Sequence, residues 1–308
     1  MASAFDSSTI FRVDGIVAVI TGGGSGIGLT MARALAFNGA AKVYLLGRRL
    51  EPLEAAAKEH PSLVPVRCDV TSKQDLQAAV DFVKADAPGG CVNLVVANSG
   101  TIGPADARFP PSGAEASVAE VRETLFTNFA MDGMNDTLAV NVTGAFFTMT
   151  AFLELLDAGN KQALRGGWGK PLAGGSGDVP AVQSQVIFTT SVSAFSRHWS
   201  SSPPYLTSKV AIMQVAKHAS TQLARFGIRV NAIAPGLYPS ELSLGLISSR
   251  NPAEESPDDQ RFIPARRWGT DEEMSGAILY LASRAGSYSN GLILTTDGGR
   301  LSVMGSTY

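Results

Sequence analysis

Short apolar runs alternate with longer segments of helical periodicity along almost the whole chain. The runs are brief, most are rich in β-branched residues, and most end at Gly, Asn, Asp, Ser or Pro, as buried strands do. They are Ile16–Ile20, Val43–Leu46, Val64–Arg67, Leu94–Ala97, Val186–Thr190, Arg229–Ile233 and Leu292–Thr295. The helical patterns are Ile27–Phe37, Leu50–Lys58, Lys73–Ala85, Leu138–Leu156, Leu206–Arg225 and Asp271–Ser283. This alternation predicts an α/β fold of Rossmann-like, doubly wound type, with about seven parallel strands and helices on both faces.

The alternation continues from the first strand to the last, so we expect a single domain over residues 1–308. Three segments depart from the pattern. Residues 101–117 are rich in Pro, Gly and Ala, and residues 157–184 are rich in Gly, so both are predicted to be surface insertions. Residues 237–264 follow the sixth strand and are predicted to form a lid over a ligand site.

The composition argues against several classes of partner and compartment. The net charge is −2 and the charges are dispersed, so we expect neither a nucleic-acid partner nor a membrane surface. No apolar run reaches bilayer-spanning length, and the start does not resemble a secretory signal. Cys68 and Cys91 have no disulfide-framework spacing, which favours a cytoplasmic location. The three histidines lack metal-ligand spacing, so no metal site is expected.

A glycine-rich turn joins the first strand to the first helix. Glycines let the backbone approach a pyrophosphate closely, and a helix N-terminus supplies N–H donors and a favourable dipole. The alternative is a tight strand–helix turn that binds nothing. The candidate binding residues in Thr21–Gly28 are Gly22, Gly24, Ser25, Ile27 and Gly28.

The end of the second strand predicts the choice of nucleotide. An acidic residue there binds the ribose 2′-hydroxyl of NAD in Rossmann units. This chain has Gly47 followed by Arg48 and Arg49. A guanidinium binds a 2′-phosphate through charge-assisted hydrogen bonds, so we predict NADP(H), with Arg48 the better candidate. The alternative is that both arginines are solvated residues at a helix start.

Ser191, Tyr205 and Lys209 form a candidate catalytic set. Tyr205 and Lys209 are four residues apart and share a face of the predicted helix. An ammonium beside the phenol would lower its pKa, and Ser191, after the fifth strand, could hydrogen-bond a reacting oxygen. Ser193 is an alternative to Ser191. A Tyr-x-x-x-Lys pair alone means little, and its context with the serine and the glycine turn gives it weight.

With these motifs in order, the whole chain resembles the short-chain dehydrogenase/reductase family. Further matches are Asp69-Val70, Ala97-Asn98-Ser99-Gly100, Asn141, Asn231–Gly236 and Asp297-Gly298-Gly299. The resemblance implies adenine contacts at Asp69 and Val70. It also implies cofactor contacts at Asn98, Gly100, Pro235 and Gly236, with Ser240 in place of the family's usual threonine. The wording of the motifs is most like that of reductases of fungal secondary metabolism.

The resemblance implies hydride transfer between nicotinamide C4 and the carbon of a small-molecule ketone or secondary alcohol. Ser191 would polarise the carbonyl oxygen and Tyr205 would donate the proton. Lys209 would hold the nicotinamide ribose and lower the Tyr205 pKa, and Asn141 would anchor a relay water. The family usually forms homodimers or homotetramers. A cofactor-binding regulator or scaffold, and a non-redox cyclase or isomerase, remain alternative functions.

Several positions have open alternatives. Asn98 could brace adjacent strand ends, Asp69 could cap a helix, and Asn141 could bond backbone within its helix. His198 is expected to be a solvated loop residue rather than part of a pocket wall. Apolar residues of the predicted lid could either face a substrate or pack onto the core; they are Leu242, Leu244, Leu246 and Ile247.

Overall fold

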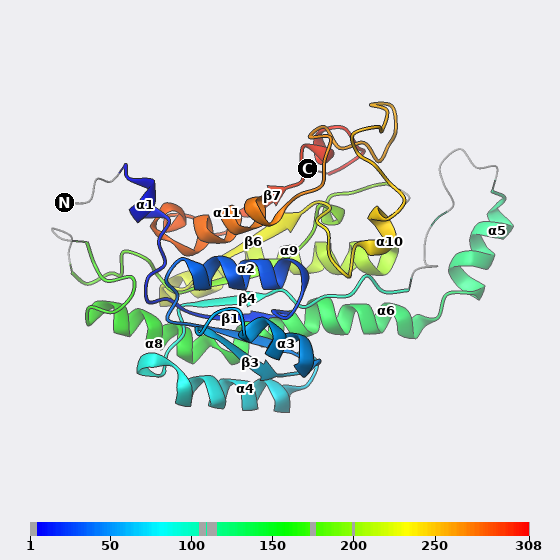
Figure 1. Ribbon diagram of the computed structural model, residues 1–308. Coiled ribbons are helices and arrows are strands. Elements are labelled where there is room, and N and C mark those ends of the chain that lie inside the picture. Colours follow the sequence, from blue (N-terminus) through cyan, green and yellow to red (C-terminus); the bar gives the residue numbers. More distant parts are fainter. Residues whose placement is uncertain (1–4, 105–108, 110–115, 173–176, 199–200, 308) are drawn as a thin grey trace.

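The computed structural model describes residues 5–104, 109, 116–172, 177–198 and 201–307. Seven parallel strands form one sheet in the order β3-β2-β1-β4-β5-β6-β7 (Figure 1). The strands are β1 (Val17–Thr21), β2 (Lys42–Gly47), β3 (Leu63–Arg67), β4 (Leu94–Ala97), β5 (Gln185–Thr189), β6 (Arg229–Pro235) and β7 (Ile293–Thr296). The predicted doubly wound α/β fold is confirmed.

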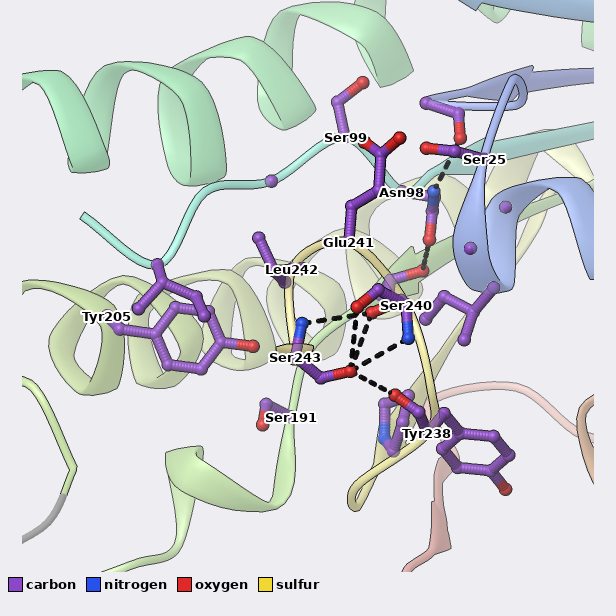
Figure 2. A pocket seen from close by; sticks show the side chains of 18 of the residues that line it. Ser25, Asn98, Ser99, Ser191, Tyr205, Tyr238, Ser240, Glu241, Leu242 and Ser243 are labelled. Carbon is purple, nitrogen blue, oxygen red and sulfur yellow. Dashed lines mark hydrogen bonds between the residues drawn. The ribbon is translucent and has the colours of Figure 1, made fainter. Parts of the chain in front are cut away.

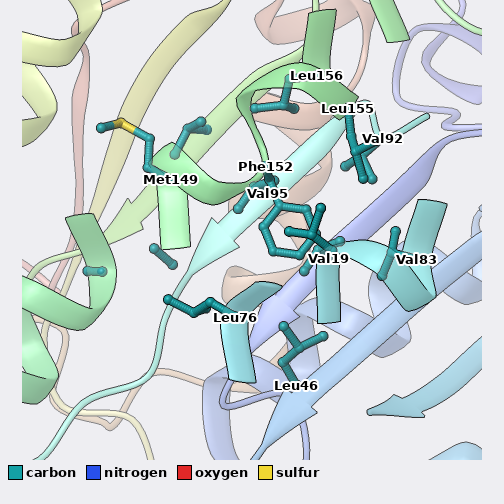
Figure 3. Close-up of a cluster of buried hydrophobic side chains, with 14 of the residues drawn as sticks. Val19, Leu46, Leu76, Val83, Val92, Val95, Met149, Phe152, Leu155 and Leu156 are labelled. Atoms are coloured by element: carbon teal, nitrogen blue, oxygen red, sulfur yellow. The ribbon is translucent and has the colours of Figure 1, made fainter. Parts of the chain in front are cut away.

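Helices cover both faces of the sheet because strand side chains alternate between them. The long helices are α2 (Gly26–Phe37), α3 (Leu50–Ala57), α4 (Lys73–Asp86), α6 (Met131–Leu138), α7 (Ala145–Ala151), α8 (Leu153–Leu164), α9 (Pro203–Leu223) and α11 (Asp271–Ala282). Ala18 and Ile20 of β1 pack with α2, α3 and α11. Val17 and Val19 face the opposite way and pack with α4, α7, α8 and α9 (Figures 1 and 3).

Shorter elements connect these layers. They are α1 (Ser7–Ile10), α5 (Val118–Arg122), α10 (Leu244–Ile247), the π-helices η2 (Glu123–Thr127) and η3 (Ala139–Gly144), and the 3₁₀ turns η1 (Pro88–Gly90), η4 (Val192–Ala194), η5 (Ala224–Phe226), η6 (Arg284–Gly286) and η7 (Arg300–Ser302). No single helix of the described ranges is long and apolar enough to cross a bilayer, and one bent pair, Met131–Ala151 with Leu153–Leu164, meets that test together.

The helix expected at Leu138–Leu156 differs from the prediction in three ways. It begins at Met131, contains the wide turn η3, and breaks at Phe152, after which α8 continues to Leu164. Residues 157–164 of the expected insertion are therefore helical, and Gly159 in that stretch is buried. Most of the expected insertion at 101–117 lies outside the described residues.

The strand order defines where a ligand can bind. Chain connections from β1 proceed toward β2 and β3, whereas those from β4 proceed in the opposite direction toward β7. At such a switch point the loops after the two strands diverge and leave a crevice at the carboxyl edge of the sheet. The glycine turn follows β1 and Asn98 follows β4, so both lie at this crevice.

The break at Phe152 places a large side chain in the core. Phe152 is fully buried among Val19, Val95 and Leu76 (Figure 3). We predict that Phe152→Ala lowers the free energy of unfolding by about 3–5 kcal/mol, because it leaves a cavity in a packed interior. Chemical denaturation monitored by circular dichroism measures the change.

The matched control is Phe126→Ala, since the Phe126 ring is 70% exposed. Its substitution is expected to change stability by no more than about 0.5 kcal/mol. Equal effects of the two substitutions would contradict the assignment of Phe152 to the core.

Candidate active site

One cavity of about 960 Å³ lies at the carboxyl edge of the sheet. Its walls come from the segments that follow all seven strands, including the predicted lid after β6. The sequence candidates that line it are Gly22, Gly24, Ser25, Ile27, Gly28, Arg48, Arg49, Asp69, Val70, Asn98, Gly100, Ser191, Tyr205, Lys209, Pro235, Gly236 and Ser240. Asn141 is the candidate that does not line it.

The glycine turn has the shape of a pyrophosphate cradle. Gly22 and Gly26 have φ values of 67° and 53°, a region in which a side chain is strained. A Cβ at Gly28 would overlap the Gly22 carbonyl oxygen. Ser25 is the N-cap of α2 and makes no side-chain capping bond, so backbone donors of the first turn face the cavity. These features fit a dinucleotide.

Asn98 ties three strand ends together beneath this turn. Its Nδ2 donates to the Thr21 carbonyl oxygen at 3.0 Å, and its Oδ1 accepts from Thr189 Oγ1 at 3.1 Å. Its backbone N–H donates to Thr21 Oγ1 at 2.9 Å. These hydrogen bonds show Asn98 bracing adjacent strand ends, which was one of its two predicted roles. Asn98 also lines the cavity (Figure 2).

The two arginines after β2 have different surroundings. Arg49 Nη2 forms an ion pair with Glu241 Oε2 of the predicted lid at 2.6 Å, and both side chains are exposed. Arg48 is exposed and forms no ion pair among the described residues. The Asp69 pKa is lowered by the Thr71 backbone N–H and, less strongly, by Arg48. Arg48 is therefore the guanidinium free to meet an anion here.

Asp69 shapes the turn after β3. Its Oδ1 accepts from the Thr71 backbone N–H at 2.9 Å and from Thr71 Oγ1 at 2.7 Å. Ser72, and not Asp69, is the N-cap of α4, with its hydroxyl accepting from the Asp75 N–H. Asp69 and Val70 thus form a fixed section of the cavity wall.

Ser191, Tyr205 and Lys209 line the same cavity. Figure 2 shows Ser191 and Tyr205 on the side away from Ser25 and Asn98. Ser191 is the N-cap of η4, and its Oγ accepts from the Ser193 N–H at 3.1 Å. The Ser191 hydroxyl hydrogen-bonds the Tyr205 hydroxyl, whereas Ser193, which also lines the cavity, contributes its backbone N–H to the turn. Lys209 lies one turn after Tyr205 on α9, with Nζ 5.5 Å from the ring centroid.

The expected lowering of the Tyr205 pKa is not what the site shows. Burial raises the pKa of Tyr205, and the hydrogen bond with Ser191 opposes that rise. Burial also lowers the pKa of Lys209 to about 8, while its Nζ donates to the Thr189 carbonyl oxygen at 2.9 Å. Both shifts have the same main cause, because burial disfavours the charged form of each group, the phenolate of Tyr205 and the ammonium of Lys209.

Asn141 acts from behind the cavity wall. It lies in the π-helix η3, a wide turn of a kind that often marks functional sites. Its Oδ1 accepts from the Thr101 N–H at 2.8 Å, and its Nδ2 donates to the Thr101 carbonyl and to Ser208 Oγ, both at 2.9 Å. The side chain therefore joins the loop after β4 to α9, a link beyond its own helix.

The predicted lid contributes part of its apolar surface to the cavity. Leu242 and Leu246 line it, whereas Leu244 and Ile247 do not. Ser240 lies against Gly26 of the glycine turn, and its hydroxyl is 3.1 Å from that of Ser243 (Figure 2). Leu242 and Leu246 are therefore placed to face a substrate, whereas Leu244 and Ile247 are not.

The expectation for His198 was wrong. This side chain is 9% exposed and hydrogen-bonds Gln260, so it is not a solvated loop residue. Sequence reasoning also missed three arginines and a methionine that line the cavity, from the lid and the chain end. They are Arg250, Arg261, Arg300 and Met304. The available signal was the position of Arg300 directly after Asp297-Gly298-Gly299.

Comparison with known proteins identifies the family. The family profile described as "short chain dehydrogenase" matches residues 16–164, and that described as "Enoyl-(Acyl carrier protein) reductase" matches residues 178–300. Short-chain dehydrogenase/reductase SAT3 of Stachybotrys chartarum is 55% identical, covering 90% of this chain and all of that protein. Short-chain dehydrogenase/reductase VdtF of Byssochlamys spectabilis is 40% identical, covering 99% of each chain.

Two solved structures share the architecture. The Pseudomonas aeruginosa RhlG/NADP active-site complex has a TM-score of 0.74 and 25% identity, covering 94% of this chain and 98% of that one. A 7α-hydroxysteroid dehydrogenase complexed with NADH and 7-oxo glycochenodeoxycholic acid has a TM-score of 0.72 and 26% identity, covering 99% and 100%.

The chain belongs to the short-chain dehydrogenase/reductase family, a family of oxidoreductases that use a nicotinamide cofactor. Its expected likeness to fungal members is confirmed. Within the described ranges, no group of three or more His, Cys, Asp or Glu residues is placed to hold a metal ion.

The cradle generates a prediction about Gly28. We expect Gly28→Ala to weaken nicotinamide nucleotide binding by at least about tenfold, because the added methyl meets backbone that cannot rotate away. Fluorescence titration measures the dissociation constant, and circular dichroism checks the fold. Gly276→Ala on α11 is the matched control, since no heavy atom lies near its added methyl. Unchanged binding by a folded Gly28→Ala protein would refute the cradle.

Proposed function

We propose that this protein is an NADP(H)-dependent oxidoreductase that reduces a ketone, or oxidises a secondary alcohol, by hydride transfer. The observation that carries the proposal is the meeting of Ser191, Tyr205 and Lys209 with the glycine turn in one cavity. A nucleotide held at the turn would extend along the carboxyl edge of the sheet toward Tyr205. A binding protein without chemistry would not need this hydroxyl pair beside a buried lysine.

The residues divide the work on the reacting oxygen. When bound, the reduced nicotinamide supplies the hydride that adds to the carbonyl carbon. Ser191 Oγ donates a hydrogen bond to the carbonyl oxygen, and Tyr205 Oη donates the proton that completes the hydroxyl group. The raised pKa of Tyr205 keeps it protonated for reduction near neutral pH. The ammonium of Lys209 donates to the nicotinamide ribose.

Asn141 holds the proton path in place in this proposal. By bonding both backbone groups of Thr101 and the Ser208 hydroxyl, it fixes the spacing between the loop after β4 and α9. The wide turn η3 offers the position for a relay water behind Lys209. Gly100 approaches both Asn141 and Lys209 at this point, which keeps the passage narrow.

The preference for NADP(H) is supported by charge at the end of β2. Gly47 stands where a carboxylate would repel a phosphate, and Arg48 and Arg49 line the cavity beside it. The solved relatives hold both kinds of nucleotide, NADP in RhlG and NADH in the hydroxysteroid dehydrogenase. The local guanidinium groups therefore carry this part of the proposal.

The remaining parts of the proposal concern the protein's setting. The fungal relatives support a role in secondary metabolism. The location in the cytoplasm and the assembly as a homodimer or homotetramer are proposed from the family resemblance alone. The partner is a small molecule with a carbonyl or alcohol group. Residues 237–264 serve as the substrate lid, with Leu242 and Leu246 as its apolar contacts. The single domain covers residues 1–308, with surface insertions at 101–117 and in the part of 157–184 that follows α8.

The first test removes the proton donor. Tyr205→Phe is expected to lower kcat for ketone reduction by about 10²- to 10⁴-fold while leaving NADPH affinity unchanged, because it deletes one hydroxyl. The decrease in NADPH absorbance with a panel of aryl ketones measures kcat. Tyr280→Phe is the matched control, since the Tyr280 hydroxyl lies beside Ser289, away from the cavity. Retained activity in Tyr205→Phe would refute the assignment.

The second test addresses nucleotide choice. Arg48→Ala is expected to weaken NADPH binding by about 10-fold or more and to leave NADH binding nearly unchanged, because the lost charge-assisted hydrogen bonds serve only the 2′-phosphate. Fluorescence titration with both nucleotides measures the ratio. Arg284→Ala, at an exposed arginine outside the cavity, is the control. An equal loss for both nucleotides would count against the role of Arg48.

A further inference from the structure

A buried arginine lies at the substrate side of the cavity. Arg300 is 8% exposed and belongs to η7, the turn that follows β7. It lines the same cavity as Ser191 and Tyr205. A charge in such a place is costly unless it is paired with an opposite charge.

The chain end packs the turn that carries Arg300 against the segment that follows Ser191. Leu301 packs in one apolar cluster with Val192 and Phe195, which follow Ser191. Thr307 N–H donates to the Phe195 carbonyl at 2.7 Å. The Asp297 carboxylate caps the turn by accepting from the backbone N–H groups of Gly299 and Leu301, at 2.9 and 2.8 Å. Arg300 is thus fixed to the wall that carries Ser191, across from the nucleotide turn.

Among the described residues, no carboxylate forms an ion pair with Arg300, although Glu255, Asp259 and Asp297 are near enough to attract its charge. Its Nη1 donates to the Arg261 carbonyl oxygen at 3.0 Å, and its Nε lies 3.3 Å from the Met304 sulfur. The three acidic groups nearby have other partners. Glu255 pairs with Arg250, Asp259 pairs with Arg261, and Asp297 caps the turn. Among the described residues, Arg300 forms no ion pair.

A second guanidinium, that of Arg250, lies close to Arg300, and its charge is paired with Glu255. Arg250 Nη2 donates to the same Arg261 carbonyl oxygen at 2.9 Å, so the two guanidinium groups converge on one acceptor. The Arg250 side chain is 10% exposed, and Arg261 also lines the cavity. Burial, and next the charge of Arg250, lower the pKa of Arg300 to about 10. An anion entering the cavity would offset both the cost of burying the Arg300 charge and its repulsion by Arg250.

We infer that the substrate carries a carboxylate, which Arg300 binds while the ketone or alcohol group lies at Ser191 and Tyr205. The inference rests on the proposed function and adds the substrate class to it. A carboxylate accepts two parallel hydrogen bonds from a guanidinium, which fixes its orientation as well as its position. Leu242, Leu246 and Met304 then contact the apolar part of the molecule between the two polar ends.

The test compares keto acids with their methyl esters, using para-acetylbenzoate and two longer aryl keto acids as probes. Calorimetry measures the dissociation constant of each acid and ester for the protein saturated with NADP⁺. The wild-type protein is expected to bind at least one acid about 10- to 100-fold more tightly than its ester. Arg300→Gln is expected to remove that preference, and Arg300→Lys to keep part of it.

Arg284→Gln is the matched control and should retain the preference of the wild type. Equal affinity for acid and ester in the wild type, or no binding of any acid, would overturn the inference. So would Arg300→Gln weakening acid and ester by the same factor, since that is the effect of a merely structural arginine. Reduction of the esters tests the proposed reaction separately. An enzyme that reduces the esters but has no preference for the acids would contradict the carboxylate site at Arg300 and leave the proposed reaction standing.

Discussion

The hydrogen bonds that join the ends of β1, β4 and β5 are the constraint on which the rest of the site depends. Thr21 Oγ1 accepts from the backbone N–H groups of Asn98 and Ser99, and Asn98 in turn joins Thr21 to Thr189. The order in which the chain adds strands reverses between β1 and β4, so the loops that follow these two parallel strands diverge and leave a crevice at this edge. With the three ends locked, the glycine turn and Ser191 keep a fixed separation, which hydride transfer to an oriented carbonyl requires.

The strands were predictable because a strand buried on both faces has a short, continuous apolar sequence, and all seven lie within a few residues of their expected positions. The helices around η3 were harder. No residue of α5 is buried, so no apolar periodicity marks it. Gly159 lies within the stretch that was predicted to be a glycine-rich insertion, but a Cβ there would overlap the Val92 carbonyl oxygen, so this glycine permits close packing of α8. Sequence alone does not separate these two uses of glycine.

Site residues that belong to local motifs could be predicted from the sequence. Properties that depend on how distant segments pack together could not. The turn, Arg48, Ser191, Tyr205 and Lys209 are brought together from local patterns at strand ends. The direction of the Tyr205 pKa depends on how much water the folded cavity excludes, which no local pattern encodes. Arg250 and Arg300 are fifty residues apart and meet only because the chain end folds back beside η4.

The exposed ion pair between Arg49 and Glu241 joins the end of β2 to the first residues of the predicted lid. A nucleotide 2′-phosphate would compete with Glu241 for Arg49, and the first residues of the lid would then lose an anchor. Coupling of this kind is reciprocal, so a substrate that orders the lid would also alter the affinity for the phosphate-bearing nucleotide. The identity of the bound nucleotide would thus alter substrate binding through Glu241, an exposed carboxylate, with no contact between the two ligands.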